Sequence, residues 1–180
     1  MLELVSFPPI TGRPGQRAGP ENIMENRIPQ ITVIIPTYNR YDILEKTLLA
    51  YTKQNISPTL FELIIVDDGS TDSTPDHILQ WQQENPQLNI TLLCQNNNGG
   101  PSRARNVGIS ASKAPLILIT GDDMIPDPTL IESHLEFHRS HPEKHRACLG
   151  KVDWHPDLQI SPLMNFVTDI AGYQFNFHSI

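Results

Sequence analysis

Cysteine is scarce in this sequence, which contains only Cys94 and Cys148 among 180 residues. Two distant cysteines provide neither a disulfide framework nor the short spacing of a metal site, so a reducing compartment is the default expectation. We therefore interpret both cysteines as buried, inert thiols.

Positive charge is also scarce, because 13 Lys and Arg face 20 Asp and Glu and the net charge is −7. The few basic residues form no cluster, so the basic face that binds nucleic-acid phosphates is missing. The composition argues against a nucleic-acid partner. An anionic ligand would have to be attracted by positive charge close to its own binding site.

Long apolar runs are absent from the sequence. The sequence contains no stretch of about 18 apolar residues, the length that a transmembrane helix needs. The N-terminus also lacks the basic region and apolar core of a secretory signal. We expect a cytoplasmic protein, and peripheral attachment to a membrane stays open. With 38% hydrophobic and 18% charged residues, the chain has the composition of one globular domain.

The hydrophobic pattern divides the chain into three parts. Residues 1–30 contain five prolines and three glycines and show no period, which predicts a poorly ordered extension. Residues 31–152 alternate short apolar runs with amphipathic stretches and form the predicted domain. Residues 153–180 are interpreted as the start of an incomplete region, so the fold is expected to be truncated.

Apolar runs predict buried strands at 31–36, 61–66, 89–94, 116–120 and, less regularly, 147–152. Helices are predicted between them at 42–51, 73–84, 101–111 and 128–139, with Leu44, Leu48 and Tyr51 on one face of the first. Ala104, Gly108 and Ala111 give the third helix a small-residue face. This alternation predicts an α/β fold whose mostly parallel sheet is flanked by helices and connected by right-handed crossovers.

Polar clusters follow four of these strands, at residues 37–39, 67–68, 96–100 and 122–123. Ligands of open parallel sheets bind at the carboxyl ends of the strands. We therefore expect one crevice to collect all four clusters.

Asp122 and Asp123 are the chemical centre that the sequence indicates, although two adjacent acids can also simply cap or solvate a loop. Carboxylates near a diphosphate would repel it by roughly 3 kcal/mol at about 5 Å and an effective dielectric constant near 20. The pair is therefore compatible with phosphate only if a divalent cation, Mg²⁺ or Mn²⁺, lies between them.

The other clusters have structural alternatives as well. Asp67 and Asp68 are typical turn residues, but either carboxylate could accept a hydrogen bond from a base or ribose. Tyr38 could pack on a helix or stack on a base. The glycines before Pro101 could expose helix amides to an anion, but the loop lacks a P-loop lysine and a GxGxxG pattern.

Four histidines gather at His134, His138, His141 and His145. We interpret them as polar helix surface, because their spacing lacks the HExxH arrangement of a metal site.

Four motifs then combine: IIPTYNR at 34–40, IVDDGSTD at 65–72, NGGPSRARNVG at 98–108 and GDDMIP at 121–126. Together they resemble the family 2 glycosyltransferases of the GT-A fold, a Rossmann-like architecture, over about residues 31–152. The resemblance implies a donor of the UDP- or GDP-sugar type, a divalent metal, and transfer with inversion to an acceptor such as a polysaccharide, a lipid or a protein glycan.

The resemblance also implies roles for individual residues. Pro36, Thr37, Tyr38 and the adjoining Asn39 would line the nucleotide, with Tyr38 stacking on the base. Asp68, with Asp67 beside it, would hydrogen-bond the base, and Arg105 and Asn106 would lie near the donor pocket. Asp123 would be the metal ligand, and Asp122 would lie near the ribose or the metal. Residues 153–180 would be the start of an incomplete acceptor-binding region.

Two departures from the family pattern leave alternatives open. The first acid of the family's Asp-x-Asp motif falls at Gly121, and no general base is recognisable among Asp153, Asp157 and Asp169.

Three hypotheses for the function follow. The first hypothesis is the donor-binding part of a metal-dependent inverting glycosyltransferase. The second is a non-catalytic nucleotide-sugar-binding module or an inactive remnant. A phospho-acceptor receiver domain is a weaker third, because its acids should follow the first and third strands.

Overall fold

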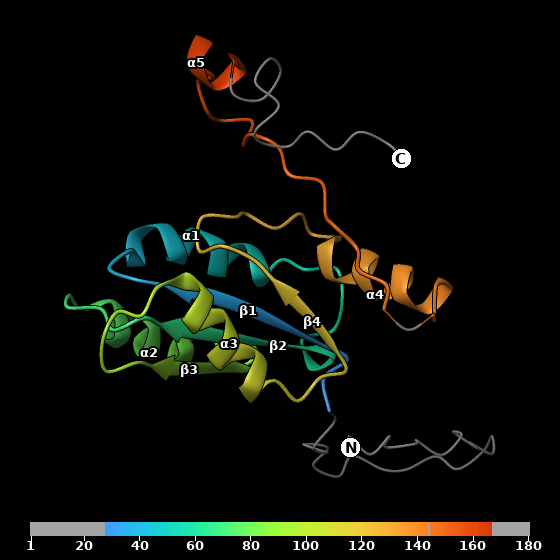
Figure 1. Cartoon of the computed structure of the whole chain (residues 1–180), viewed down its shortest axis with the longest axis horizontal. Helices are drawn as coiled ribbons and strands as arrows, with labels where there is room; N and C mark the ends of the chain where they lie inside the picture. The colour runs from blue at the N-terminus through green and yellow to red at the C-terminus, as the bar shows by residue number, and fades with distance from the viewer. Residues whose placement is uncertain (1–27, 144, 167–180) are drawn as a thin grey trace.

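The computed structural model describes residues 28–143 and 145–166. Its centre is a four-stranded sheet in the order β3-β2-β1-β4 (Figure 1). The strands are β1 (Ile31–Thr37), β2 (Phe61–Asp67), β3 (Ile90–Cys94) and β4 (Leu116–Ile119), and all three pairings are parallel. The predicted parallel α/β sheet is therefore confirmed, with strand boundaries within one residue of the expected ones.

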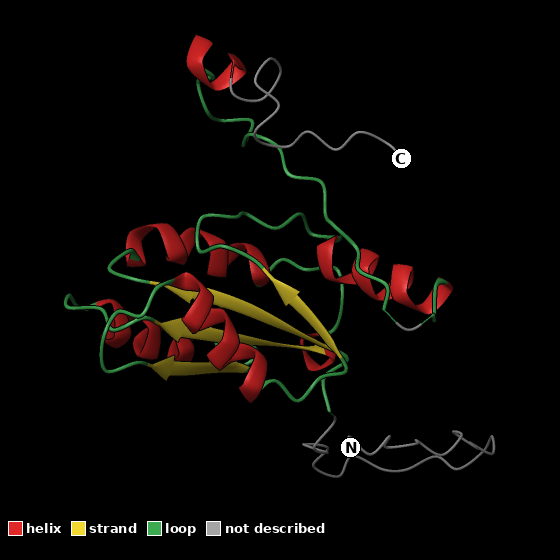
Figure 2. Cartoon of the chain, in the orientation of Figure 1, coloured by secondary structure: helices red, strands yellow, loops and turns green. Residues whose placement is uncertain are grey.

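Helices cover both faces of this sheet (Figure 2). Apolar side chains of α1 (Tyr41–Tyr51), α2 (Thr74–Glu84) and α4 (Leu130–Ser140) share one core with the strands, while α3 (Pro101–Ala111) packs on the opposite face. A 3₁₀ turn, η1 (Pro58–Leu60), leads into β2, and a short helix, α5 (Pro162–Asn165), follows the domain.

The strand pattern explains why the sheet is buried on both sides. Every residue of β1 and β2 is buried, so successive side chains supply opposite faces. Val33 and Ile35 point into the core below α1 and α2, whereas Ile34 packs toward α3. On α1, the predicted stripe of Leu44, Leu48 and Tyr51 is fully buried against the sheet.

The small-residue face of α3 lets this helix approach the sheet closely. Ala104 and Gly108 are buried, and a Cβ atom added to Gly108 would lie 2.5 Å from the Cγ2 of Ile34. Since real Cβ atoms do not approach other atoms so closely, a glycine is required where α3 crosses β1.

The predictions of a fifth strand and of buried cysteines were wrong. The described part of residues 147–152 contains no strand, and Leu149 is 75% exposed. This short run includes Gly150, which weakens strand formation, and no described strand pairs with it, so its apolar residues alone did not determine its structure. Neither cysteine is buried: Cys94 is exposed because β3 lies at the edge of the sheet, and Cys148 is half-buried.

The predicted terminal regions extend beyond what the structure describes. Of the extension at 1–30, residues 1–27 lie outside the described residues, as do residues 167–180 of the region at 153–180. Within the described ranges, no helix has the length and apolar character that crossing a membrane requires.

Substituting Gly108 tests the close packing of α3 on β1. We expect Gly108→Ala to lower the free energy of unfolding by about 1–3 kcal/mol through overpacking, although alanine normally favours a helix by about 1 kcal/mol. Urea unfolding measures the change, with the exposed Ser102→Ala of the same helix as the control. Equal or greater stability of Gly108→Ala would contradict the packing described here.

Tyr51 gives a prediction for pH dependence. Its side chain is buried, its hydroxyl has no hydrogen-bond partner among the described residues, and burial raises its pKa. The unfolded chain then ionises near pH 10 while the folded chain keeps the proton, so stability falls as pH rises above about 10.

We therefore expect Tyr51→Phe to match or exceed the wild-type unfolding free energy at pH 7 and to lose less stability between about pH 10 and 12. Chemical unfolding at both pH values is the measurement. A loss of more than about 1 kcal/mol at pH 7 would show that the hydroxyl has a stabilising partner.

Candidate functional site

The carboxyl ends of β1 and β4 meet where the chain reverses its direction across the sheet. The chain runs from β1 outward through β2 to β3, and then returns to place β4 on the other side of β1. A crevice at such a switch point is where open parallel sheets bind ligands. Thr37 ends β1 at this point, and Asp122 and Asp123 follow β4.

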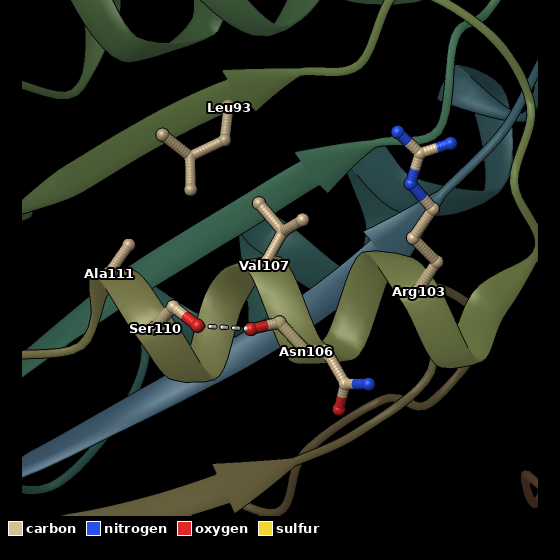
Figure 3. Close-up of a pocket in the computed structure, with 6 residues that line it drawn as sticks. All are labelled: Leu93, Arg103, Asn106, Val107, Ser110 and Ala111. Carbon is tan, nitrogen blue, oxygen red and sulfur yellow. Dashed lines mark hydrogen bonds between the residues drawn. The ribbon is translucent and has the colours of Figure 1, made fainter.

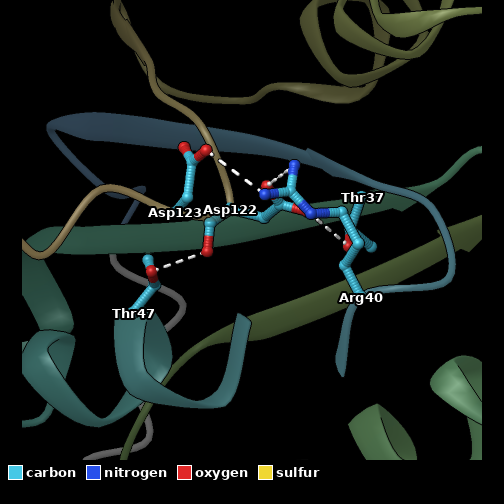
Figure 4. A network of polar contacts seen from close by, with 5 residues as sticks. All are labelled: Thr37, Arg40, Thr47, Asp122 and Asp123. Carbon is cyan, nitrogen blue, oxygen red and sulfur yellow. Dashed lines mark hydrogen bonds and ion pairs between the residues drawn. The ribbon is translucent and has the colours of Figure 1, made fainter. Parts of the chain in front are cut away.

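Asp122 is held from two directions (Figure 4). The Thr37 hydroxyl donates to its Oδ2 at 2.9 Å, and the Thr47 hydroxyl of α1 donates to its backbone oxygen at 2.8 Å. The residue is only 5% exposed. Burial raises the pKa of the Asp122 carboxyl, while the Thr37 hydrogen bond and the charge of Arg40 favour its ionised form. This carboxylate is therefore fixed in position before any ligand binds.

Arg40 joins Asp122 to Asp123. Its Nη1 lies 3.1 Å from Oδ1 of Asp122, and its Nη2 lies 3.3 Å from Oδ2 of Asp123. The side chains of Arg40 and Asp123 are 44% and 54% exposed, so this end of the network faces solvent. Two carboxylates thus converge on one cationic group, as Figure 4 shows.

The same oxygens fit a hard divalent cation. Mg²⁺ and Mn²⁺ prefer carboxylate oxygens, and Mg²⁺ is usually bound through one or two carboxylates, with water and substrate phosphates completing its shell. In the described ranges, no group of three or more His, Cys, Asp or Glu side chains could enclose a metal. A metal at Asp122 and Asp123 would therefore depend on ligands from a bound substrate.

The acids after β2 are engaged within the chain. Both carboxylate oxygens of Asp67 accept hydrogen bonds from Ser70, one from the amide at 3.0 Å and one from the hydroxyl. Asp68 accepts from the Gln95 side chain at 2.7 Å and from the amides of Gly99 and Gly100 at 3.0 and 2.7 Å. Asp67 thus makes the local turn contacts that the sequence left as an alternative, whereas Asp68 fixes the distant loop that opens α3.

The loop after β1 is fixed by Asn39. This residue has a φ of 52°, its amide donates to the Ser70 hydroxyl at 2.8 Å, and its side-chain oxygen accepts from the Thr71 amide at 2.8 Å. Beside it, Tyr38 is 37% exposed and Pro36 is buried within β1. Tyr38 is thus accessible at the strand ends, whereas the Asn39 side chain connects two loops.

The strand ends bring several of the predicted residues into contact, and the Asp68 amide also donates to the Thr37 carbonyl at 2.9 Å. Hydrogen bonds connect Thr37 with Asp122, Asn39 with the loop after β2, and Asp68 with the loop after β3. No hydrogen bond or ion pair in the described part of the chain joins Arg105, a half-buried residue of α3, to these clusters.

Arg40 and Thr47 were missed by the sequence reasoning. Thr47 carried a signal, because it is a polar residue within the otherwise apolar stripe of α1. Arg40 follows a strand-end loop and had no distinguishing pattern of its own. His134, which was expected on a polar helix surface, is buried, and burial lowers its pKa.

Two hollows lie on the surface of the described domain. A shallow groove of about 490 Å³ between α3 and β3 (Figure 3) contains none of the acids discussed above, and its lining is largely apolar: Leu93, Arg103, Asn106, Val107, Ser110 and Ala111. A more polar hollow of about 350 Å³ lies between the starts of α1 and α2 and includes Arg40, Asp42 and Asp72 in its wall. The second adjoins the acid pair, so we place the candidate site there and at the strand ends.

The fold and this strand-end site define a class of proteins, the GT-A glycosyltransferases. A mannosyltransferase from Pyrobaculum calidifontis, solved in complex with GDP-Man and Mn²⁺, superposes with a TM-score of 0.58 at 27% identity over 63% of this chain and 33% of its own. Staphylococcus aureus TarS in complex with UDP-GlcNAc gives the same TM-score at 25% identity, over 68% of this chain and 37% of that one.

The chain belongs to glycosyl transferase family 2, whose model matches residues 32–152. A validoxylamine A glucosyltransferase from Streptomyces hygroscopicus subsp. limoneus is 32% identical over 126 residues, which are 69% of this chain and 27% of the relative. The chain thus spans about a quarter of that protein's length.

The role of Asp68 in fixing the α3 loop is testable by stability. We expect Asp68→Ala to cost about 2–4 kcal/mol of unfolding free energy, because three donors lose a charged acceptor, and Asp68→Asn to cost less because it keeps one acceptor oxygen. Urea unfolding measures both, with the exposed Glu136→Ala of α4 as the control. A cost for Asp68→Ala no larger than that of the control would show that the loop does not depend on this carboxylate.

Proposed function

We propose that the chain is the donor-binding part of a metal-dependent inverting glycosyltransferase that uses a UDP- or GDP-sugar. The observation that carries this proposal is the convergence of the Asp122 and Asp123 carboxylates on one cationic position at the switch point of the sheet. The ligands named for two neighbours, GDP-Man with Mn²⁺ and UDP-GlcNAc, support a nucleotide-sugar donor.

The residues of the strand ends take distinct roles in this proposal. Asp123, which is accessible, and Asp122, which is fixed by Thr37 and Thr47, would hold the metal between them. A bound Mg²⁺ or Mn²⁺ would act as a Lewis acid that neutralises charge on the departing diphosphate. The exposed ring of Tyr38 would stack on the base.

Asp68 acts on the donor through the loop that it fixes. Both of its oxygens already accept hydrogen bonds from Gln95 or the glycine amides, and it holds Gly99 and Gly100 at the start of α3. Contact of Asp68 with a base would use the remaining lone pairs of the carboxylate, since each oxygen can accept more than one hydrogen bond. The acceptor, whether polysaccharide, lipid or protein glycan, is left open.

The general base is not assigned. Asp153 pairs with Lys151 at 3.0 Å, Asp157 lies 3.7 Å from His155, and all four side chains are exposed. Asp169 lies outside the described residues. Donor binding without transfer is therefore the second candidate function. Hydrolysis or transfer of UDP-GlcNAc or GDP-Man by this chain at an enzymatic rate would exclude it.

Calorimetry tests the proposed metal-dependent donor site. We expect UDP or GDP to bind at least about tenfold more tightly with Mn²⁺ than without, because the metal offsets repulsion between the diphosphate and the two carboxylates. Asp123→Ala should abolish this enhancement, and the exposed acid variant Glu136→Ala should retain it. Nucleotide binding that is indifferent to Mn²⁺, or an unchanged enhancement in Asp123→Ala, would refute the proposal.

A further inference from the structure

Arg40 occupies the position that a divalent cation would take. Its two terminal nitrogens contact one oxygen each of Asp122 and Asp123, at 3.1 and 3.3 Å. The same carboxylate oxygens cannot face both the guanidinium and a metal ion without bringing two positive groups together. A metal ion bound to these same two oxygens would therefore require Arg40 to withdraw.

The surroundings of Arg40 allow this withdrawal. Its backbone is anchored, because its carbonyl accepts the amides of Ile43 and Leu44 at the start of α1. Its side chain is nearly half exposed and borders the polar hollow between α1 and α2. The guanidinium can therefore turn into this hollow while the backbone stays in place.

Asp122 stays in position when the Arg40 side chain moves away. Asp122 keeps its hydrogen bonds from Thr37 and Thr47, which do not involve Arg40. The ion pair between Arg40 and Asp123 is exposed and therefore weak. The charge of Arg40 beside the buried Asp122 carboxylate would have to be replaced by the divalent ion itself. The structure thus combines a fixed carboxylate with a removable counter-charge.

We propose that Arg40 is an internal counter-cation that competes with the divalent metal for Asp122 and Asp123 and makes metal binding depend on the nucleotide diphosphate. This inference rests on the proposed function of the same site. With a metal bound, the displaced guanidinium would be a second positive group at this site, and the diphosphate would supply negative charge for both. Metal and diphosphate therefore bind cooperatively, and by reciprocity each raises the affinity of the other.

Replacing Arg40 should change the two affinities in opposite directions. We expect Arg40→Gln to bind Mn²⁺ alone about 3- to 30-fold more tightly than the wild type, because two competing ion pairs are gone. The same variant should bind UDP or GDP in saturating Mn²⁺ more weakly, because the diphosphate loses a positive partner. A purely structural role for Arg40 would instead weaken both.

The experiment measures Mn²⁺ directly, by the electron paramagnetic resonance signal of the free ion, and nucleotide binding by calorimetry on the 180-residue chain. Arg40→Lys keeps the charge but cannot bridge two carboxylates with a planar fork, so its Mn²⁺ affinity should lie between those of the wild type and Arg40→Gln. Arg146→Gln, which changes the net charge at an exposed pair with Glu143, is the control. Thermal unfolding establishes that each variant is folded.

The outcomes separate this inference from the proposed function. If the wild type shows Mn²⁺-enhanced nucleotide binding but Arg40→Gln binds Mn²⁺ alone no more tightly than Arg146→Gln, the role of Arg40 is overturned and the donor site stands. If nucleotide binding is indifferent to Mn²⁺ in the wild type and in Asp123→Ala, both are overturned.

Discussion

The site depends on the position of Asp122, a buried carboxylate where β4 ends beside β1. The Thr37 hydroxyl comes from the last residue of β1 and the Thr47 hydroxyl from the helix that follows it, so one strand–helix unit fixes a residue 75 or more positions later in the chain. A buried carboxylate without partners would be costly, and these contacts offset that cost. The consequence is a carboxylate that is already held in place where β1 and β4 end.

Sheet order explains why this contact forms at all. If β4 followed β3 outward, the acids would lie beyond the edge strand rather than beside β1. Because β4 instead pairs with β1 in parallel register, Ile34 faces Ile119 and the two strand ends meet. The close packing of α3, made possible by Gly108, carries the chain back across the sheet to this place. The strand order that defines the fold therefore also brings the site residues together.

Much of this architecture could be predicted from the sequence. The β-branched run of β1, the apolar run within β2 and the apolar stripe of α1 are strong signals, and the structure confirms these elements to within one or two residues. The strand predicted at 147–152 does not form, because a short apolar stretch becomes a strand only when another strand pairs with it. Exposure of Cys94 was misjudged because the sequence does not reveal which strand lies at an edge.

The site was predictable in its location and less so in its contacts. Strand-end placement correctly grouped Thr37, Asp68 and Asp122, but which partners satisfy each carboxylate depends on loop geometry that no spacing rule provides. Asp68 holds a glycine loop, and Arg40 bridges the two acids, because side chains distant in sequence meet only in the folded chain. Such long-range polar contacts are the part of the site that requires a structure.

The proposed donor site requires a divalent cation at Asp122 and Asp123. Anomalous diffraction from crystals of the chain grown with Mn²⁺ and UDP or GDP tests this requirement most directly. We expect one manganese peak at bonding distance from an Asp123 carboxylate oxygen and from the diphosphate. A bound nucleotide with manganese absent from this pair, or manganese elsewhere in the molecule, would contradict it.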